Sequence, residues 1–334
     1  MLKRTEADTP ISLQDSESTF ESGGAVSTRT LRVGVIGAGV FGGHHATKFS
    51  SMDGARLVGV FDPRRASAEA LVERLGQGEA FDSVDELAAA CDALVIASPA
   101  ITHAELARKS LELGKHTLVE KPLALDGAVA RELAVLAQEK GLVLQVGHQE
   151  RLVFAAMGLL STPERPRRIE AVRMSPRSPE GRCEDVSVVF DLMIHDLDLA
   201  AELFGGETAT ATTYGRNMHT KFLDEATAEL VFPGGVARLT ASRCAPARKR
   251  TMMIEYPSGR VEIDFLTREV HNETPFDIRV DVSEILPDPL RAAAEGFVAA
   301  IRGERVSPVT GGVGARAAML AELVEDAASV AVAA

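Results

Sequence analysis

Short apolar runs alternate with helical segments over residues 31–150 of this 334-residue chain, and no other feature constrains its fold so strongly. Each run is rich in valine, leucine and isoleucine, which is typical of a strand buried on both faces. Helical segments such as 67–76 and 127–141 separate the runs. This alternation predicts a doubly wound parallel sheet with right-handed crossovers and helices on both faces. The predicted strands are 31–37, 57–61, 93–98, 116–120 and 142–147.

The rhythm changes after about Glu150, where strand-like runs follow one another with only turn residues between them. Neighbouring strands joined in this way pair antiparallel. We therefore predict a second, α+β region with a mostly antiparallel open sheet, closed by helices at 289–302 and 313–333. The strand-like runs are 226–233, 235–243, 250–259 and 260–266.

A glycine-rich turn follows the first predicted strand and precedes a helical segment. In Gly37-Ala-Gly39-Val-Phe-Gly42 the first glycine permits a tight turn, the second lets the backbone approach a pyrophosphate, and the third allows close packing of helix on strand. The amino end of the following helix then faces the anion. This arrangement predicts a Rossmann domain that binds a nicotinamide dinucleotide. The predicted contacts from the turn are Gly37, Gly39, Val40, Phe41 and Gly42.

An acidic residue ends the second predicted strand. Asp62 follows Gly42 by about 20 residues, the spacing at which a carboxylate accepts hydrogen bonds from the adenosine ribose hydroxyls. The same carboxylate would repel the 2′-phosphate of NADP, whereas Arg64 and Arg65 would attract it. We expect NAD, with NADP the less favoured alternative.

Length and composition divide the chain into three parts. A chain of 334 residues exceeds the usual size of one hydrophobic core, which favours two domains. Residues 1–30 are rich in Ser, Thr, Glu and Asp without an apolar period, so we expect a disordered tail. The predicted α/β organisation is thus a Rossmann domain at 31–150 and a substrate-binding and oligomerisation domain at 151–334.

Two further segments end at the carboxyl edge of the predicted parallel sheet, where ligands of open α/β sheets bind. Ser98 and Pro99 end one strand and lead to His103, and we expect all three to line the nicotinamide half of the site. For His103, a polar residue at a helix start is an equally good interpretation. Another strand ends in Glu120 and Lys121, which we also assign to the cofactor site.

Three ionisable residues fit the oxidation of an alcohol. Hydride abstraction from a carbinol carbon requires that the hydroxyl proton leave too, and histidine is suited to accept it at neutral pH. His195 lies on a predicted helix with Asp191 one turn earlier, where the carboxylate would orient the imidazole. Lys121 would hydrogen-bond the reacting oxygen and stabilise alkoxide character.

Five motifs occur in the order seen in the glucose-fructose oxidoreductase/inositol dehydrogenase/rhizopine-catabolism (Gfo/Idh/MocA) family, which the chain resembles over residues 31–330. The resemblance implies that Lys121, Asp191 and His195 approach substrate and nicotinamide, and that the Lys121-Pro122 bond is cis. Within the family, the segments 147–154 and 182–199 most resemble bacterial UDP-N-acetylglucosamine 3-dehydrogenases, although 152–154 departs from the Phe-Asn-Pro usual there. The motifs are G37-A-G39-V-F-G42, S98-P99-A-I-T102-H103, E120-K121-P122, G147-H148-Q-E150-R151 and D191-L-M-I-H195-D196.

Basic residues gather in the second half of this acidic protein. The segment 165–182 holds six arginines against two glutamates, and a second cluster spans 243–250. Such clusters suit recognition of a sugar-linked diphosphate, and ion pairing on the surface or across an oligomer interface is the alternative. The predicted substrate contacts are Lys121, Arg151, Arg173, Arg177, His195 and Arg248.

The sequence leaves the substrate open. An inositol, an aldose or a dihydrodiol would make the arginine clusters incidental, and a non-catalytic NAD-binding sugar sensor would leave the Lys121, Asp191 and His195 combination unexplained. The presence of all three favours the enzyme.

Composition limits the partners. A formal net charge of -12 disfavours nucleic acid, and no apolar run approaches the length of a membrane span. Three scattered cysteines without a C-x-x-C pair suggest neither disulfides nor a zinc site. We expect a cytoplasmic homo-oligomer, a dimer or tetramer, with no metal and a small-molecule sugar substrate.

Overall fold

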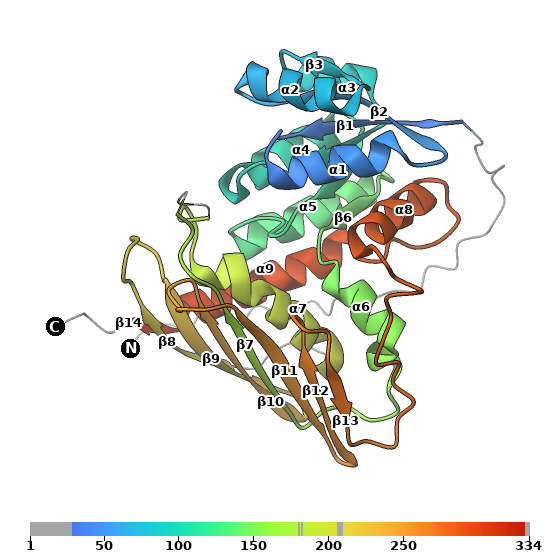
Figure 1. Ribbon diagram of the computed structural model, residues 1–334. Coiled ribbons are helices and arrows are strands. Elements are labelled where there is room, and N and C mark those ends of the chain that lie inside the picture. The colour runs from blue at the N-terminus through green and yellow to red at the C-terminus, as the bar shows by residue number, and fades with distance from the viewer. Residues whose placement is uncertain (1–28, 180, 182, 206–209, 331–334) are drawn as a thin grey trace, which may run out of the picture.

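The computed structural model describes residues 29–179, 181, 183–205 and 210–330, so the predicted disordered tail lies almost wholly outside the described residues. A parallel sheet flanked by helices occupies one end of the molecule, and a broad second sheet occupies the other (Figure 1). The two predicted sheets are therefore confirmed.

The first sheet has six parallel strands in the order β3-β2-β1-β4-β5-β6. β1 lies in the middle because Val33, Val35 and Ile36 are apolar on both faces and fully covered. All five predicted strands are present, and the three-residue β3 is the one that the sequence interpretation missed. The strands are β1 (Leu31–Ile36), β2 (Ala55–Phe61), β3 (Glu79–Phe81), β4 (Ala93–Ile96), β5 (His116–Val119) and β6 (Leu144–Val146).

Helices connect these strands as crossovers and cover both faces of the sheet (Figure 1). Several begin with a side-chain cap, as at Ser83, whose hydroxyl accepts from the Glu86 amide, and at Asp126, whose carboxylate accepts from the Val129 amide. The helices are α1 (Val40–Ser50), α2 (Arg65–Leu75), α3 (Val84–Ala90), the short η1 (Ala100–Thr102), α4 (His103–Glu112) and α5 (Gly127–Glu139).

The second sheet has eight strands in the order β13-β12-β11-β7-β10-β9-β8-β14. Its pairs are antiparallel except β7 with β10 and β8 with β14, which confirms the mostly antiparallel prediction. The strands are β7 (Arg168–Met174), β8 (Thr210–Arg216), β9 (Glu225–Phe232), β10 (Gly235–Ser242), β11 (Lys249–Tyr256), β12 (Gly259–Asp264), β13 (Val270–Asn272) and β14 (Ala328–Val330).

Four helical segments lie between the two sheets or beside them. α6 (Glu150–Met157) and the short η2 (Leu159–Ser161) lead into β7, and a π-helical turn η3 (Val189–Met193) runs directly into α7 (Ile194–Phe204). The apolar residues of α7 pack on the second sheet in one continuous core.

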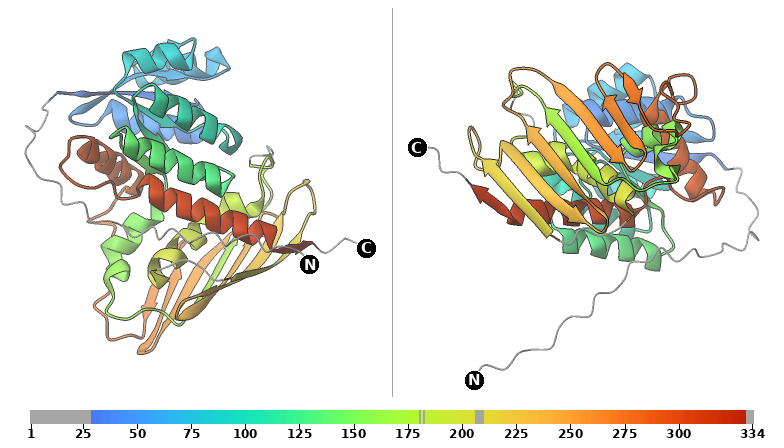
Figure 2. Two further views of the ribbon diagram at one scale, coloured as in Figure 1. Left: turned by 180° about the vertical axis from the view of Figure 1, so that it is seen from behind. Right: turned by 90° about the horizontal axis from the view of Figure 1, so that it is seen from below.

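The last two helices return to the first sheet. α8 (Pro289–Ile301) places Ala294 and Phe297 in the core beside β1, and α9 (Gly311–Asp326) lies along α5 and α7 between the two sheets (Figure 2). The prediction of a helix to residue 333 is wrong, because the chain leaves the helix after Asp326 and forms β14. The backbone of β14 pairs with β8, whose outer N–H and C=O groups would stay unpaired if the helix continued. Among the described helices, none is both long and apolar enough to span a membrane.

Candidate active site

The glycine turn between β1 and α1 has the shape that the motif predicts. Gly37 adopts a φ of +101°, and a Cβ there would lie 2.7 Å from the Ala97 carbonyl oxygen. A Cβ on Gly42 would lie 1.8 Å from the Gly37 carbonyl oxygen, so helix and strand pack too closely for any side chain. A Cβ on Gly39, by contrast, would meet no protein atom within 4 Å. The backbone at Gly39 is therefore bare on the side where a pyrophosphate would lie.

The amino end of α1 is open beside this turn. No side chain caps the helix, no acidic residue lies in its first turn, and Val40 and Phe41 are 56% and 45% exposed. Uncapped amides at a helix start attract a phosphate. The residues present thus fit the dinucleotide that the motif predicts.

Asp62 lies against the turn from the end of β2. One carboxylate oxygen accepts a hydrogen bond from the Ala38 amide at 2.8 Å, and the other accepts from the Arg64 amide at 2.9 Å. These bonds fix the carboxylate beside the bare backbone, and lone pairs remain for ribose hydroxyls. The Arg64 side chain is 80% exposed and reaches only to 3.7 Å from Asp62.

His103 is buried and bonds within the protein. Its Nδ1 lies 2.6 Å from the Pro122 carbonyl oxygen, and its Nε2 lies 2.9 Å from the Ser98 carbonyl oxygen. Both ring nitrogens are thus occupied within the protein. The side chain ties the loop after β4 to the Lys121-Pro122 bond, which is cis as the family resemblance implied.

Glu120 is likewise an internal residue. It is 7% exposed. Its carboxylate lies 2.7 Å from the His45 Nε2 of α1 and accepts a hydrogen bond from the side-chain amide of Gln149 at 3.1 Å. Burial opposes its charge, but the bond to His45 and the charges of His45 and Lys121 lower the pKa of Glu120 below its ordinary value. Its carboxylate holds the end of β5 against α1, and we do not retain it as a direct cofactor contact.

Lys121, which follows β5, forms an ion pair with Asp191 of η3. The Lys121 ammonium lies 2.5 Å from the Asp191 carbonyl oxygen and 3.3 Å from its carboxylate. The sequence interpretation paired Asp191 with His195, but here the carboxylate is taken by the lysine. Asp191 lies in the π-helical turn, a rare element that is frequent at functional sites. One of the three ammonium donors remains for a ligand.

His195 lies in the first turn of α7, and 17% of its side chain is exposed. Its Nδ1 is buried without a hydrogen-bond partner, and the Glu150 carboxylate lies 3.8 Å from it. Nε2 is therefore the ring nitrogen left for a substrate hydroxyl. Burial and the charges of Arg173 and Lys121 hold the pKa of His195 well below its ordinary value, so the ring is neutral near pH 7. The edge of the buried His148 ring packs on it, with ring centroids 6.2 Å apart.

Arg173 does not have the place of a substrate contact. It is 2% exposed and donates two hydrogen bonds to Glu150, at 2.8 and 2.9 Å, and two to Asp196, at 2.8 and 3.0 Å. The guanidinium ties β7 to the starts of α6 and α7. Because these carboxylates flank His195, Arg173 positions the histidine and is not available to a diphosphate.

Two other predicted arginines are also held within the protein. Arg151 is buried and pairs with Asp198 at 2.8 Å and Glu202 at 2.7 Å. Arg177 is on the surface and pairs with Glu184 at 2.7 Å. We do not retain Arg151 as a substrate contact, because it is buried and bonded to two carboxylates, and we do not retain Arg177, because its charge is already paired with Glu184.

Arg250 is a cation that the sequence interpretation placed in a basic cluster without choosing it. It lies opposite Arg173 in the register of β7 and β11, on the same face of the sheet. Within the described part of the chain, its guanidinium forms no hydrogen bond or ion pair, although it is partly buried. Burial and the charge of Arg173 lower the pKa of Arg250, and its own charge contributes to the lowered pKa of His195. Arg248, the predicted contact, is exposed two residues earlier.

Two family models match this chain. Residues 31–148 match the oxidoreductase family with an NAD-binding Rossmann fold, and residues 165–264 match the Gfo/Idh/MocA C-terminal domain. The chain belongs to the Gfo/Idh/MocA family. It is a dehydrogenase with an NAD(P)-binding Rossmann domain, and it acts on CH–OH donors.

Several relatives are similar over most of the chain. The UDP-N-acetylglucosamine 3-dehydrogenase of Acidithiobacillus ferrooxidans is 39% identical over 243 residues, 72% of this chain and 76% of that protein. A solved structure of that enzyme has a TM-score of 0.80 at 36% identity, covering 89% of this chain and 97% of the other. The scyllo-inositol 2-dehydrogenase (NAD(+)) of Bacillus subtilis is 30% identical over 65% of this chain and 68% of its own. The WlbA dehydrogenase of Bordetella pertussis, solved with NADH and UDP-GlcNAcA, shares the fold at a TM-score of 0.81 and 18% identity, over 91% of this chain and 96% of that chain.

Proposed function

We propose that this protein oxidises a ring hydroxyl of a nucleotide-linked sugar with NAD, and that its substrate is UDP-N-acetylglucosamine, at the 3-hydroxyl, or a related nucleotide sugar. The observation that carries the proposal is that Lys121 bonds to Asp191, one turn before His195, and that the charges of Lys121 and Arg250 add to the burial that lowers the pKa of His195. The similarity to a UDP-N-acetylglucosamine 3-dehydrogenase supports this choice of sugar.

The proposed chemistry assigns one role to each side chain. A nicotinamide cofactor held at the glycine turn would supply the hydride acceptor for the carbinol carbon. His195 accepts the hydroxyl proton through Nε2, because Nδ1 is enclosed. Lys121 donates its remaining N–H to the reacting oxygen and stabilises negative charge there. The Glu150 carboxylate near Nδ1 offsets the charge of the protonated imidazole.

We propose NAD over NADP because the Asp62 carboxylate is held beside the turn by two backbone amides. Its negative charge would repel a 2′-phosphate, while the Arg64 side chain extends into solvent. The expected contacts with the dinucleotide are Gly37, Gly39, Val40, Phe41, Gly42, Asp62, Ser98 and Pro99.

Replacement of Asp62 with Ala should relax the preference for NAD. Since a hydrogen bond to a charged group contributes about 1.5–3 kcal/mol, we expect the ratio of kcat/KM for NAD to that for NADP to fall roughly 10- to 100-fold. Steady-state kinetics with both cofactors measure this ratio. Asp53→Ala, which removes an exposed acid between α1 and β2, is the matched control and should leave it unchanged. Equal use of both cofactors by the unmodified enzyme would contradict the assignment.

The anionic part of the substrate is proposed to bind at Arg250, with Arg248 nearer the surface. A partly buried guanidinium without a carboxylate partner is costly unless a ligand supplies one, and its planar fork matches phosphate oxygens. Its neighbour Arg173 is already neutralised by Glu150 and Asp196. Arg250 is therefore the cation on this face of the sheet that is free to meet a diphosphate.

Replacement of Arg250 with Ala should reduce kcat/KM for the nucleotide sugar roughly 10- to 100-fold, mainly through KM, because a charge-assisted hydrogen bond is lost. The same change should have little effect on any residual turnover of a free sugar, which has no phosphate to lose. Arg250→Lys should retain part of the kcat/KM that Arg250→Ala loses. Arg248→Ala should lower kcat/KM less than Arg250→Ala does, because the Arg248 side chain is exposed. A loss of equal size for free and nucleotide-linked sugars would remove Arg250 from phosphate recognition.

Cofactor reduction, followed by its absorbance, tests the function itself. The panel contains UDP-N-acetylglucosamine, UDP-glucose, myo-inositol and glucose, each with NAD. We expect turnover of UDP-N-acetylglucosamine at low concentration, and a conversion product with the mass of the 3-keto sugar. Equal or better turnover of myo-inositol would replace the nucleotide sugar in the proposal.

A free cyclitol is the second candidate, because two inositol dehydrogenases are 30–32% identical to this chain over more than half its length. Lys121 and His195 would serve a ring hydroxyl of an inositol equally well. Arg250 would then have no anion to bind, and its substitution would not separate the substrates.

We further propose a homo-oligomer in the cytoplasm, which sedimentation and cell fractionation test.

A further inference from the structure

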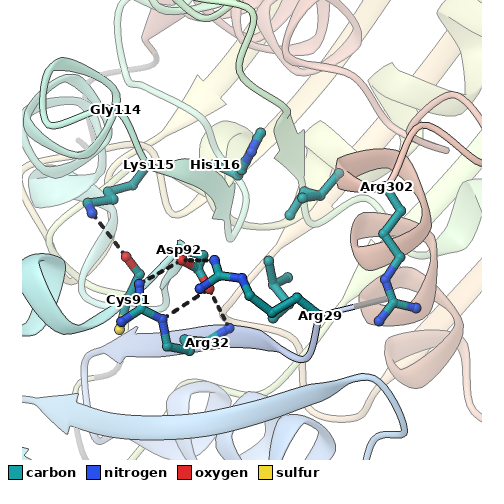
Figure 3. A pocket seen from close by; sticks show the side chains of 10 residues that line it. Arg29, Arg32, Cys91, Asp92, Gly114, Lys115, His116 and Arg302 are labelled. Carbon is teal, nitrogen blue, oxygen red and sulfur yellow. Dashed lines mark hydrogen bonds and ion pairs between the residues drawn. The ribbon is translucent and has the colours of Figure 1, made fainter. Parts of the chain in front are cut away.

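A basic pocket lies at the opposite edge of the six-stranded sheet from the glycine turn. It encloses about 320 Å³ between the start of β1, the residues that precede β4 and β5, and the end of α8 (Figure 3). The glycine turn follows the carboxyl end of β1, whereas this pocket adjoins the amino ends of the strands. It is thus a separate place in the fold, and neither the catalytic residues nor the cofactor residues line it.

Positive charge exceeds negative charge in this pocket, although the protein as a whole is acidic. Four cationic side chains line it, against the single carboxylate of Asp92. The Cys91 thiol adds no negative charge, because burial raises its pKa to about 12. The four cations are Arg29, Arg32, Lys115 and Arg302.

Asp92 neutralises only part of this charge. Its carboxylate accepts hydrogen bonds from Arg29 at 2.6 Å and from Arg32 at 2.8 and 3.2 Å (Figure 3). Although burial opposes its charge, these bonds hold the pKa of Asp92 well below its usual range, so it is ionised at any working pH. Both arginines are therefore anchored at one side of the pocket by a single negative charge.

In the described part of the chain, Lys115 and Arg302 donate hydrogen bonds only to backbone carbonyl oxygens. The Lys115 ammonium donates to the Cys91 carbonyl oxygen at 2.9 Å, and Arg302 donates to the Gly54 carbonyl oxygen at 2.8 Å. Glu304, 3.9 Å from Arg302, is 41% exposed, so solvent weakens that pair. The Arg302 Nε is buried and finds no hydrogen-bond partner among the residues that the structure describes. A carbonyl oxygen satisfies a donor but does not neutralise a cation.

His116 adds a further donor to this pocket. Its Nδ1 accepts a hydrogen bond from the Val143 amide at 3.0 Å, and burial lowers the pKa of the ring. A neutral imidazole that accepts at Nδ1 carries its proton on Nε2. Apart from Asp92 and Cys91, the ionisable side chains of the pocket therefore offer N–H groups to a ligand.

We propose that this pocket binds the phosphoryl group of a small phosphorylated molecule at a site separate from the active site. A phosphoryl group carries up to two negative charges and three acceptor oxygens, which match an excess of three positive charges and several open N–H donors better than a carboxylate does. A volume of about 320 Å³ admits a phosphate with a compact substituent, at the lower end of small-molecule sites. The proposal does not depend on which sugar the active site oxidises.

Calorimetry with inorganic phosphate tests the site in the full-length protein. The titration is run with saturating NAD, so that the glycine turn is occupied, and at constant ionic strength against sodium chloride. We expect one phosphate per chain, and at least a tenfold weaker affinity in the double variant Lys115→Gln, Arg302→Gln. The double variant Arg131→Gln, Arg238→Gln removes the same charge from exposed positions elsewhere and should bind as the unmodified protein does.

Three results would overturn the site. They are phosphate binding that disappears when NAD is bound, equal weakening in both double variants, and a phosphate affinity that the pocket substitutions leave unchanged. Lys115→Gln alone provides the comparison if the double variant does not fold, because that substitution breaks one hydrogen bond to a carbonyl and should still weaken binding severalfold. Unchanged dehydrogenase activity of the pocket variants would show that they are folded.

Discussion

We expect His195→Ala to lower kcat by roughly 10² to 10⁴, the range for loss of a positioned general base. His195 has its Nδ1 enclosed and its ring neutral near pH 7, so Nε2 is the group prepared to take the hydroxyl proton. The affinity for NAD should change little, since the glycine turn and Asp62 lie on the other domain. Single-turnover hydride transfer and a separate NAD titration measure the two effects, and circular dichroism checks folding.

The double variant Lys121→Ala, His195→Ala tests whether Lys121 takes part in the same proton transfer as His195. Lys121→Ala should also depress kcat, and the combination with His195→Ala should lose much less than the product of the single losses, as groups acting as a unit do. Multiplicative losses would mean that Lys121 acts separately, for example in positioning the cofactor. A fully active His195→Ala enzyme would remove the histidine from the mechanism.

Arg173→Met should destabilise the protein by about 3–5 kcal/mol, because it leaves the buried Asp196 and the partly buried Glu150 without their cation. Glu150 and Asp196 receive four hydrogen bonds from this one guanidinium, and both lie beside the catalytic helix start. The melting temperature should fall by roughly 10 °C, given about 2–4 °C per kcal/mol for a domain of this size. Thermal and urea unfolding at pH 7 measure the change.

Arg177→Met is the matched control for this prediction. It removes the same charge from an exposed pair with Glu184, and such surface pairs contribute about 0–1 kcal/mol. A stable, folded Arg173→Met protein with weakened binding of nucleotide sugar would contradict the positioning role and return Arg173 to the substrate contacts predicted from the sequence.

The Rossmann sheet and its glycine turn could be predicted because the signals are local. Each buried strand is a short apolar run, and the roles of Gly37 and Gly42 follow from backbone sterics within a few residues. The π-helical turn at 189–193 and the strand at 328–330 were not predicted, since their composition is that of ordinary helix and their hydrogen bonds depend on distant partners.

The arginines show where the sequence stops being informative. Composition alone identified basic segments in an acidic protein, and spacing alone identified Lys121 and His195 as candidates for the chemistry. Only the tertiary structure decided that Arg151 and Arg173 are internal partners of carboxylates, that Asp191 pairs with Lys121, and that Arg250 stays unpaired. The physical reason is that the state of a charge depends on which opposite charges fold to within about 4 Å of it, and residues such as Glu150 and Asp196 approach Arg173 from different elements.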